Sequence, residues 1–267
     1  MIVADQFRQV SEEDAQQLRE STFINDMEHH AVLPSTNSHA LGLAAVPGLN
    51  LPVLVLADRQ TAGRGRGGNR WWSGAGALTF SLILERPESS DGVSWIRVAL
   101  TTGMAVCEAL HELCPGVDAA LKWPNDVFVR SRKICGVLVE TVPQTPRRIV
   151  LGVGINVNNS VADAPMTVCS WGVSLLEVAG YPFRLASVLS TILNHLSAHL
   201  VLLQREPAQL QRRWETHCML TGKRIQLVAG SRRVRGCCLG IDAHGALLIE
   251  TPAGVEACLS GEVIWWA

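Results

Sequence analysis

Apolar residues along this 267-residue chain fall into two kinds of pattern. Residues 51–57 (LPVLVLA) and 77–85 (ALTFSLILE) are short continuous apolar runs bounded by polar segments, which is typical of buried strands. Residues 95–114 instead place apolar side chains three or four positions apart, and this spacing predicts a helix. The chain therefore mixes strands and helices from its first third onward.

The same patterns predict further elements. Strands are expected at 119–123, 127–129, 134–141 and 148–158, and helices at 183–203 and 207–214. The polar tetrad Arg130–Lys133 joins two of these strands as a tight turn. Ser35-Thr36-Asn37 is typical of a helix N-cap and predicts a helix over 37–43. Ser11, followed by three acids, resembles a shorter helix start.

The pattern of apolar and polar residues changes after Leu220. From there, short β runs are broken by glycine, as in a small β-barrel. We expect a boundary near residue 217, with a main domain over 1–216 and a barrel over 217–267. Residues 1–30 are polar and are expected to form an N-terminal extension, too short for a winged helix-turn-helix module.

Composition narrows the class of protein. Hydrophobic residues make up 48% of the chain and charged residues 18%, as in a globular protein. The net charge of −1 provides no overall basic field for nucleic acid. No signal pattern is visible, and no apolar run reaches the ~18–20 residues of a membrane span. Eight cysteines without CxxC spacing fit a reducing compartment better than zinc or disulfides. We expect a soluble cytoplasmic protein.

The most distinctive segment is rich in glycine and arginine. Gly63-Arg64-Gly65-Arg66-Gly67-Gly68-Asn69-Arg70 follows a buried-type strand and precedes Trp71-Trp72. Glycine lets backbone N–H groups approach an anion, and arginine adds forked donors for phosphate or carboxylate. The alternatives are a solvated loop or an RGG-like nucleic-acid segment. Because the run is single and follows a strand, we favour a lid that becomes ordered when an anionic ligand offsets its conformational entropy.

Lys133 is the second candidate for anion chemistry. It enters an apolar strand in which Gly136 leaves room for a ligand, so its ammonium can neutralise a carboxylate or phosphate. The alternative is a solvated turn lysine. Trp123 is more typical of a core residue, and Asp126 fits a turn cap or a magnesium ligand. Gly152-Val153-Gly154 alone indicates only a buried strand, and the His29-His30 pair predicts no role.

Taken in order, these motifs resemble the biotin–protein ligase family. The match comprises Ser35-Thr36-Asn37, Gln60 to Gly68, Trp71, Lys122-Trp123-Pro124-Asn125-Asp126, Lys133 to Glu140, and Gly154-Ile155-Asn156-Val157-Asn158. It is strong over about residues 31–160 and weaker through 213–215 and 240–247. The resemblance implies an α+β fold in which a mixed sheet is flanked by helices, as in class II aminoacyl-tRNA synthetases. It also implies a C-terminal SH3-like barrel.

The resemblance also implies an activity. Biotin and ATP would form biotinyl-adenylate with Mg²⁺, and the biotin would pass to a lysine of a biotin carboxyl carrier domain. No covalent enzyme intermediate is required, which agrees with the absence of a Ser-His-Asp pattern. The missing winged-helix domain predicts a monofunctional ligase that binds no operator. The lack of a membrane-length apolar run predicts no membrane partner. A monomer and a homodimer both stay open.

Site residues follow from the same resemblance. Those implied for biotin are Ser35, Thr36, Asn37, Gln60, Gly63, Arg64, Gly65, Arg66, Lys133 and Gly136. Those implied for the adenylate or ATP are Arg66, Trp71, Lys122, Asn125, Asp126, Lys133 and Asn156. Lys133, Arg64 and Arg66 are the expected catalytic residues, and Asp126 is expected to orient Lys133 or hold magnesium.

Two departures and two alternatives accompany this interpretation. Gly67 and Asn69 stand where many relatives have basic residues, so the lid is less positive here. A lipoate or octanoate ligase shares the chemistry but lacks the Gly-Arg-Gly-Arg loop. A non-catalytic biotin-binding regulator is the other alternative, favoured by loss of the catalytic lysine, which is present here as Lys133.

Overall fold

A computed structural model describes residues 9–86 and 95–267. Its main helices are α2 (Glu12–Ser21), α3 (Thr36–Ala44), α4 (Trp95–Leu113), α5 (Met166–Cys169), α6 (Leu175–Ala179), α7 (Leu185–Arg205) and α8 (Pro207–His217). The strands of the first sheet are β1 (Asp26–Leu33), β2 (Val53–Gln60), β3 (Leu78–Glu85), β4 (Ala119–Lys122), β5 (Asp126–Val129), β6 (Arg132–Thr141) and β7 (Arg148–Ile155). Those of the second are β8 (Arg224–Ala229), β9 (Arg232–Ile241), β10 (Leu247–Thr251), β11 (Gly254–Cys258) and β12 (Glu262–Trp266).

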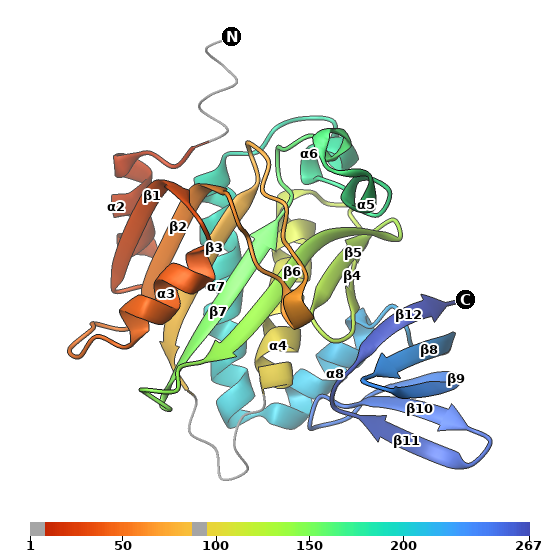
Figure 1. The fold of residues 1–267 in the computed structure, drawn as a ribbon. Coiled ribbons are helices and arrows are strands. Elements are labelled where there is room, and N and C mark those ends of the chain that lie inside the picture. The colour runs from red at the N-terminus through yellow and green to blue at the C-terminus, as the bar shows by residue number, and fades with distance from the viewer. Residues whose placement is uncertain (1–8, 87–94) are drawn as a thin grey trace.

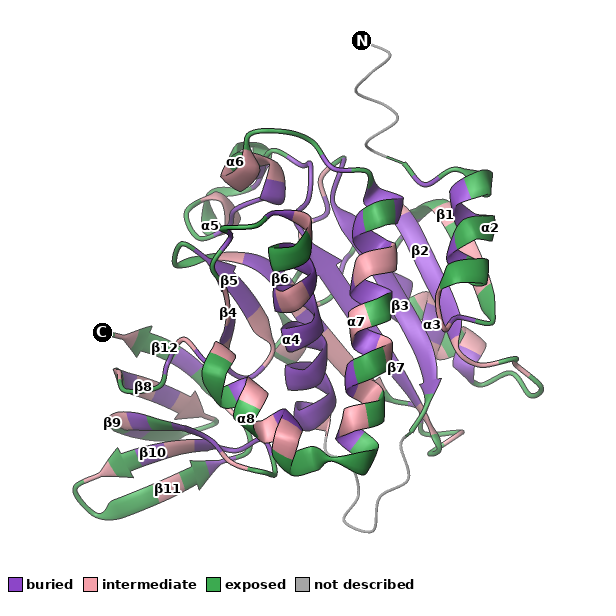
Figure 2. Cartoon of the chain, turned by 180° about the vertical axis from the view of Figure 1, so that it is seen from behind, coloured by how far each residue is buried: buried purple, intermediate pink, exposed green. Residues whose placement is uncertain are grey.

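The first sheet has seven strands in the order β1-β2-β3-β7-β6-β5-β4. β1 runs parallel to β2, and the other neighbours are antiparallel, so the sheet is mixed. The long helices α4 and α7 lie side by side over one face of this sheet (Figure 2). Their apolar stripes pack with Leu54, Phe80 and Leu151 of the sheet in the main core.

The opposite face is covered differently. α3 packs over β2, β3 and β7, where Ala40 and Ala44 join Val55 and Val150 in a second, smaller core. The remainder of this face is crossed by the connection from β2 to β3, drawn in orange in Figure 1. That connection contains the glycine–arginine segment and a short 3-10 turn at Arg66–Gly68. The residues that line the largest part of the pocket described below come from this connection and from the sheet beneath it.

β8 to β12 form a separate five-stranded antiparallel sheet at the C-terminal end (Figure 1). Several contacts join it and the segment before it to the first sheet, among them the ring of Trp266 on β12 against Phe128 on β5. The indole Nε1 of Trp123 donates to the carbonyl of Gly245 at 3.0 Å, and Met219 N donates to Leu121 O at 2.9 Å. The mixed sheet with flanking helices and the C-terminal antiparallel sheet confirm the predicted fold class. The exact domain boundary near residue 217 stays a prediction.

Most predicted elements are found within a few residues of their expected bounds. β1 was not predicted, and residues 9–30, expected as a polar extension, contain α2 and the first part of β1. β1 is an edge strand with one buried residue, Leu33, so it has no apolar run to indicate it. The short helices α5 and α6 were not predicted either.

α7 is 21 residues long and apolar enough to meet the criteria for a membrane span. The sequence did not predict a membrane-length apolar run here, because polar residues interrupt the apolar positions of α7. Leu189, Ile192 and Leu196 are fully buried in the main core, where α7 packs on α4. Core helices meet the same criteria, so this is weak evidence for a span.

Candidate active site

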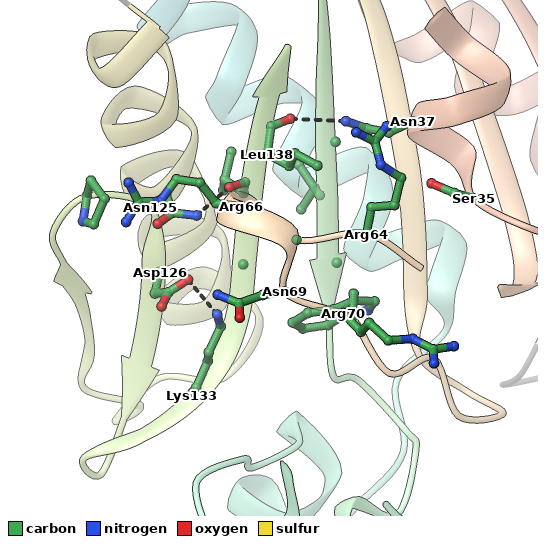
Figure 3. A pocket seen from close by; sticks show the side chains of 18 of the residues that line it. Ser35, Asn37, Arg64, Arg66, Asn69, Arg70, Asn125, Asp126, Lys133 and Leu138 are labelled. Carbon is green, nitrogen blue, oxygen red and sulfur yellow. Dashed lines mark hydrogen bonds and ion pairs between the residues drawn. The ribbon is translucent and has the colours of Figure 1, made fainter. Parts of the chain in front are cut away.

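A pocket that is partly open to solvent lies between the glycine–arginine connection and the first sheet (Figure 3). Its walls come from the start of α3, the connection after β2, and the strands β5, β6 and β7. Its lining comprises Ser35, Thr36, Asn37, Gln60, Arg64, Gly65, Arg66, Asn69, Arg70, Trp71, Lys122, Trp123, Pro124, Asn125, Asp126, Lys133, Gly136, Val137, Leu138, Gly152, Val153, Gly154 and Glu262.

The first turn of α3 is held against the sheet by hydrogen bonds. Ser35 caps the helix, because its hydroxyl accepts from Ser38 N. The carboxamide oxygen of Gln60, at the end of β2, accepts from Thr36 N at 2.7 Å. The hydroxyl of Ser81 on β3 lies 2.8 Å from the Thr36 hydroxyl. Ser35, Thr36 and Ser81 are buried and Gln60 is partly buried, and because each is hydrogen-bonded their positions are set before a ligand arrives.

Asn37 occupies the centre of this network. Its Oδ1 accepts from the Ser81 hydroxyl at 2.6 Å, and its Nδ2 donates to the Glu140 carboxylate at 2.9 Å. The amide lies directly over Gly152 of β7, where a Cβ would come 1.9 Å from Asn37 Oδ1. Position 152 must therefore be glycine for Asn37 to lie flat on the sheet.

Trp71 covers the neighbouring part of the sheet in the same way. Gly136 and Gly154 are register partners on β6 and β7. A Cβ on Gly154 would lie 2.4 Å from the Trp71 ring, so the indole rests on bare backbone. The glycines of the 152–154 run, which alone predicted no ligand, thus give the pocket a flat floor.

Lys133 stands at the opposite end of the pocket from α3 (Figure 3). Its Nζ lies 2.6 Å from Asp126 Oδ1 and 5.9 Å from the centre of the Trp71 ring. The hairpin that carries both residues turns at Arg130 and Ser131, whose φ angles of 50° and 61° are typical of a tight two-residue turn. Asn125 fixes the base of this end by donating to Val137 O at 2.6 Å.

The glycine–arginine connection lies over this floor with most of its side chains exposed. Arg64 pairs with Glu140 on β6, with 2.7 Å between Nη2 and Oε1. Arg66 donates to the carbonyl of Gly261 in the loop before β12, so the C-terminal sheet contacts the pocket rim. Arg70 is directed away from the Lys133–Asp126 pair in Figure 3. Each of the first two arginines therefore has a protein partner when no ligand is present.

Positive charge dominates the pocket. The lining carries five cationic side chains, from Arg64, Arg66, Arg70, Lys122 and Lys133, and two carboxylates, from Asp126 and Glu262. Burial is the main cause that lowers the pKa of Lys122, and the nearby Lys133 charge acts in the same direction. Lys122 also lies 4.6 Å from the centre of the Trp266 ring. An anion entering here would relieve the repulsion between these cations.

The structure brings together nearly all residues that the sequence singled out. Two of them do not line the pocket. Gly63 is a buried residue of the connection itself, and Asn156 is buried with its amide donating to Val173 O at 3.2 Å. Asp126 lies beside Lys133, within range to orient it.

Sequence reasoning missed three residues with clear positions at the site. Ser81 supports Thr36 and Asn37 from below, and Glu140 connects Asn37 with Arg64. Glu262 reaches the pocket from the C-terminal sheet. Ser81, a polar residue within the apolar run 77–85, was the one available signal, because a buried polar group needs partners.

Comparisons with known proteins agree with this geometry. Residues 30–156 match the "Biotin/lipoate A/B protein ligase family", and residues 221–266 match the "Biotin protein ligase C terminal domain". The bifunctional ligase/repressor BirA of Escherichia coli is 32% identical over 240 residues, which span 87% of this chain and 73% of that protein. The biotin–[acetyl-CoA-carboxylase] ligase of Paracoccus denitrificans is 31% identical over 238 residues, spanning 86% and 97%.

Solved structures give the same result. The biotin protein ligase of Aquifex aeolicus in complex with biotin and ATP superposes with a TM-score of 0.79 at 28% identity. The match covers 91% of this chain and 99% of that one. The chain therefore belongs to the biotin–protein ligase family, as the order of its motifs predicted.

Proposed function

We propose that this protein ligates biotin to a lysine of an acceptor protein, using ATP and a biotinyl-adenylate intermediate. The observation that carries the proposal is the polarity of the pocket. Neutral hydrogen-bonding groups of Ser35, Thr36 and Asn37 occupy one end, and Lys133 and Arg66 stand toward the other (Figure 3). The charge of Arg64 at the first end is offset by its ion pair with Glu140. Biotin has a neutral ureido group at one end and a carboxylate at the other, so it matches this arrangement.

The neutral end would hold the ureido group. Ser35, Thr36, Asn37 and Gln60 present hydroxyl and amide groups whose positions are set by internal hydrogen bonds. Pre-positioned partners cost little conformational entropy when a ligand binds. Gly136 would let Lys133 and the Trp71 ring lie close to the floor beside the biotin chain, and Gly65 would lie above that chain in the connection.

The cationic end would activate the carboxylate. One carboxylate oxygen attacks the α-phosphorus of ATP, the bond from that phosphorus to the bridging oxygen breaks, and pyrophosphate leaves. Attacking group and phosphate are both anionic, so the site must hold them together and offset their repulsion. Lys133, oriented by Asp126, would contact the biotin carboxylate and the α-phosphate, with Arg64 and Arg66 adding charge from the connection. Trp71, Lys122 and Asn125 would contact the adenylate.

The second half-reaction needs no enzyme nucleophile. The neutral amine of the acceptor lysine attacks the acyl carbon, AMP leaves with the electron pair, and the nitrogen loses a proton to form the amide. The mixed anhydride is prone to hydrolysis, so water must be kept out between the two steps. We assign this to the connection at residues 61–72, which would close when ligand anions replace Glu140 and Gly261 as partners of Arg64 and Arg66.

A magnesium ion would accompany ATP. Magnesium commonly takes one or two carboxylates and completes its shell with phosphate oxygens and water. Asp126 provides such a carboxylate, but one of its oxygens already contacts Lys133. We therefore place most ligands of the ion on the phosphates, with Asp126 supplying at most one oxygen. The ion would neutralise phosphate charge while Lys133 acts on the carboxylate side.

For the acceptor we propose a biotin carboxyl carrier domain, and for the compartment the cytoplasm. The relatives from Mycobacterium tuberculosis and Paracoccus denitrificans are named as biotin–[acetyl-CoA-carboxylase] ligases. An acceptor lysine would approach from the exposed side of the pocket, past the rim formed by the connection. Whether one or two copies assemble stays open in this proposal.

The test is transfer to an acceptor. Labelled biotin, ATP and Mg²⁺ are incubated with the protein and a biotin carboxyl carrier domain, and label on the acceptor lysine is followed by mass spectrometry. We expect label on that lysine, no label without ATP, and no reduction by excess lipoate. Transfer of lipoate in place of biotin would favour the lipoate ligase alternative. Biotin binding without transfer would favour a non-catalytic regulator.

A further inference from the structure

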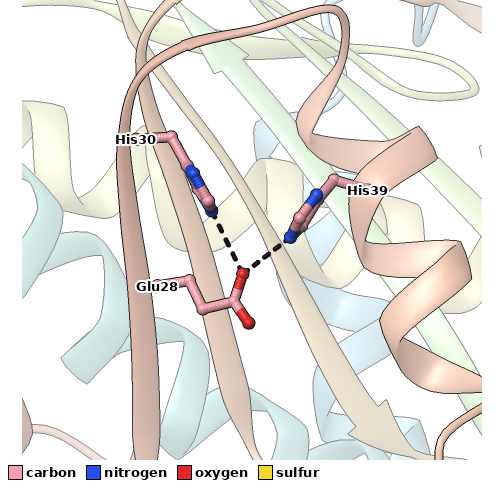
Figure 4. A group of neighbouring side chains, drawn as sticks. All are labelled: Glu28, His30 and His39. Carbon is pink, nitrogen blue, oxygen red and sulfur yellow. Dashed lines mark hydrogen bonds and ion pairs between the residues drawn. The ribbon is translucent and has the colours of Figure 1, made fainter.

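A second group of side chains converges outside the pocket. Glu28 and His30 lie two residues apart on β1 and therefore on the same face of the strand. His39, on α3, faces them across a short gap (Figure 4). His30 Nε2 and His39 Nε2 lie 3.1 Å and 2.6 Å from the same oxygen, Glu28 Oε2. None of the three lines the pocket.

From this convergence we propose that Glu28, His30 and His39 bind a divalent transition metal ion, foremost Zn²⁺, with water as the fourth ligand. Two imidazoles and one carboxylate are a ligand set that suits zinc and leaves one position open. Ligand atoms on a tetrahedral zinc lie ~3.3 Å apart, given bonds of ~2.0–2.1 Å. The nitrogen–oxygen distances here need to open by less than ~1 Å to admit the ion.

The surroundings permit that movement. The three side chains are 32%, 35% and 37% exposed for His30, His39 and Glu28, so each can rotate and the ion can reach them from solvent. When Nε2 of a histidine binds metal, Nδ1 carries a proton and needs an acceptor. At this exposure, water provides one for both rings.

A comparable cluster elsewhere serves as an internal contrast. Glu108 on α4 and His195 and His199 on α7 also bring their ligand atoms within 4.8 Å of one another. His199, however, is 2% exposed, and among the described residues its Nδ1 has no hydrogen-bond partner. Metal at Nε2 would leave a buried N–H at Nδ1 with no acceptor among the described residues, which disfavours binding there. Arg213 also lies 3.4 Å from the Glu108 carboxylate. We therefore assign the ion to the β1–α3 cluster alone.

The ion would join two elements next to the biotin end of the pocket. β1 is the edge strand of the sheet, and α3 carries Ser35, Thr36 and Asn37 at its first turn. His39 is two residues beyond Asn37 in the same helix. A metal bridge between β1 and α3 is therefore a stabilising site, placed outside the reacting groups.

The experiment is zinc binding by the full chain, purified without a histidine tag and freed of metal with a chelator under reducing conditions. Zinc affinity is measured by competition with a chromophoric chelator. We expect one ion per chain, and at least a ~10-fold weaker affinity in both His39→Gln and Glu28→Gln. His29→Gln, on the opposite face of β1, and His195→Gln are the matched controls and should bind as wild type does.

Two further readouts guard against misfolding and other ligands. At zinc concentrations of 100 times Kd, the Tm of wild type should rise by roughly 5–10 °C, and that of His39→Gln should not. Without zinc, the variants should melt as wild type does by circular dichroism. Equal affinity of wild type and His39→Gln would overturn the proposal. So would loss of binding in His195→Gln, or a thiolate charge-transfer band in the Co²⁺-loaded protein, which would indicate cysteine ligands.

Discussion

The two walls of the pocket are built on different principles. The floor consists of sheet backbone at Gly152 and Gly154 together with Asn37, and its polar groups are buried and bonded to one another. The rim, residues 61–72, is mostly exposed. Backbone hydrogen bonds and Trp71 hold its ends, and the arginine side chains over the pocket contact Glu140 and Gly261. One wall is fixed by buried hydrogen bonds, and we propose that the other exchanges its protein partners for ligand.

This difference suits the floor to recognising the ligand and the rim to assisting the reaction. A rigid floor distinguishes one neutral shape from another, because misplaced hydrogen-bonding groups are left unpaired. An exposed cationic rim cannot do that, but it can neutralise charge and exclude water once the ligand is bound. Lys133 stands between the two, fixed on a strand yet 33% exposed at the cationic end. The predictions below probe these assignments, from the largest effect to the smallest.

Lys133→Ala should have the largest effect. We expect biotin-dependent pyrophosphate release to fall by about 10²–10³-fold, because one charge that stabilises the transition state is lost. The unfolding transition should be retained, since the lysine is a partly exposed strand residue. Arg132→Ala, which removes the exposed neighbouring charge on β6, is the control and should keep wild-type release. Wild-type release by Lys133→Ala would remove this residue from the chemistry.

Gly152→Ala tests the rigid floor. The new Cβ would lie 1.9 Å from Asn37 Oδ1 and displace the amide. We expect at least ~10-fold weaker biotin binding by calorimetry, the cost of one or two lost hydrogen bonds. Gly42→Ala in α3, where nothing lies within 4 Å of the added Cβ, should bind biotin as wild type does. If both variants bound equally well, the floor would not be a recognition surface.

Glu140→Gln tests how the rim is held. The substitution removes the charge that pairs with Arg64 while keeping an acceptor for Asn37. Partly exposed ion pairs contribute about 0.2–1 kcal/mol, so cleavage of the ligand-free rim by trypsin should accelerate roughly 2–5-fold. With biotin and ATP bound, wild type and variant should become equally resistant. Unchanged cleavage of the free variant would show that this pair does not restrain the rim.

Lys122 gives the smallest effect, visible only at alkaline pH. Burial lowers the pKa of Lys122, so its charge is lost at a lower pH than that of an ordinary lysine. As the pH rises through the lowered pKa of Lys122, the KM for ATP should therefore rise a few-fold. The affinity for biotin should stay constant over the same pH range. Lys122→Arg keeps its charge and should flatten the profile. An identical profile in Lys122→Arg would assign the titration to another group.

The sequence predicts those features of the fold and site that depend on residues close together in the chain, and it does not predict those that depend on residues far apart. The strands at 77–85 and 148–158 and the helix at 95–114 follow from local apolar patterns, and the chemistry of Lys133 and Arg64 follows from residue type. The Ser81–Asn37–Glu140 network does not, because its bonds join residues 44 and 103 positions apart and depend on sheet register. β1 was missed because an exposed edge strand carries no apolar signature.

Asn156 is a single residue whose side-chain direction could not be predicted from the sequence. Its position in the family motif led to an expectation of adenylate contact, but the sequence does not reveal which way an amide at a strand end points. In the structure it bonds to Val173 O and Asn159 in the interior. Its contact with an adenylate stays a prediction.

The central claim is that this pocket joins biotin to AMP before any acceptor is present. The most direct measurement is exchange of labelled pyrophosphate into ATP, with protein, Mg²⁺ and either biotin or lipoate, and without acceptor. The account predicts exchange that depends on biotin, is absent with lipoate, and is lost in Lys133→Ala. No exchange with biotin, or exchange that proceeds equally with lipoate, would contradict it.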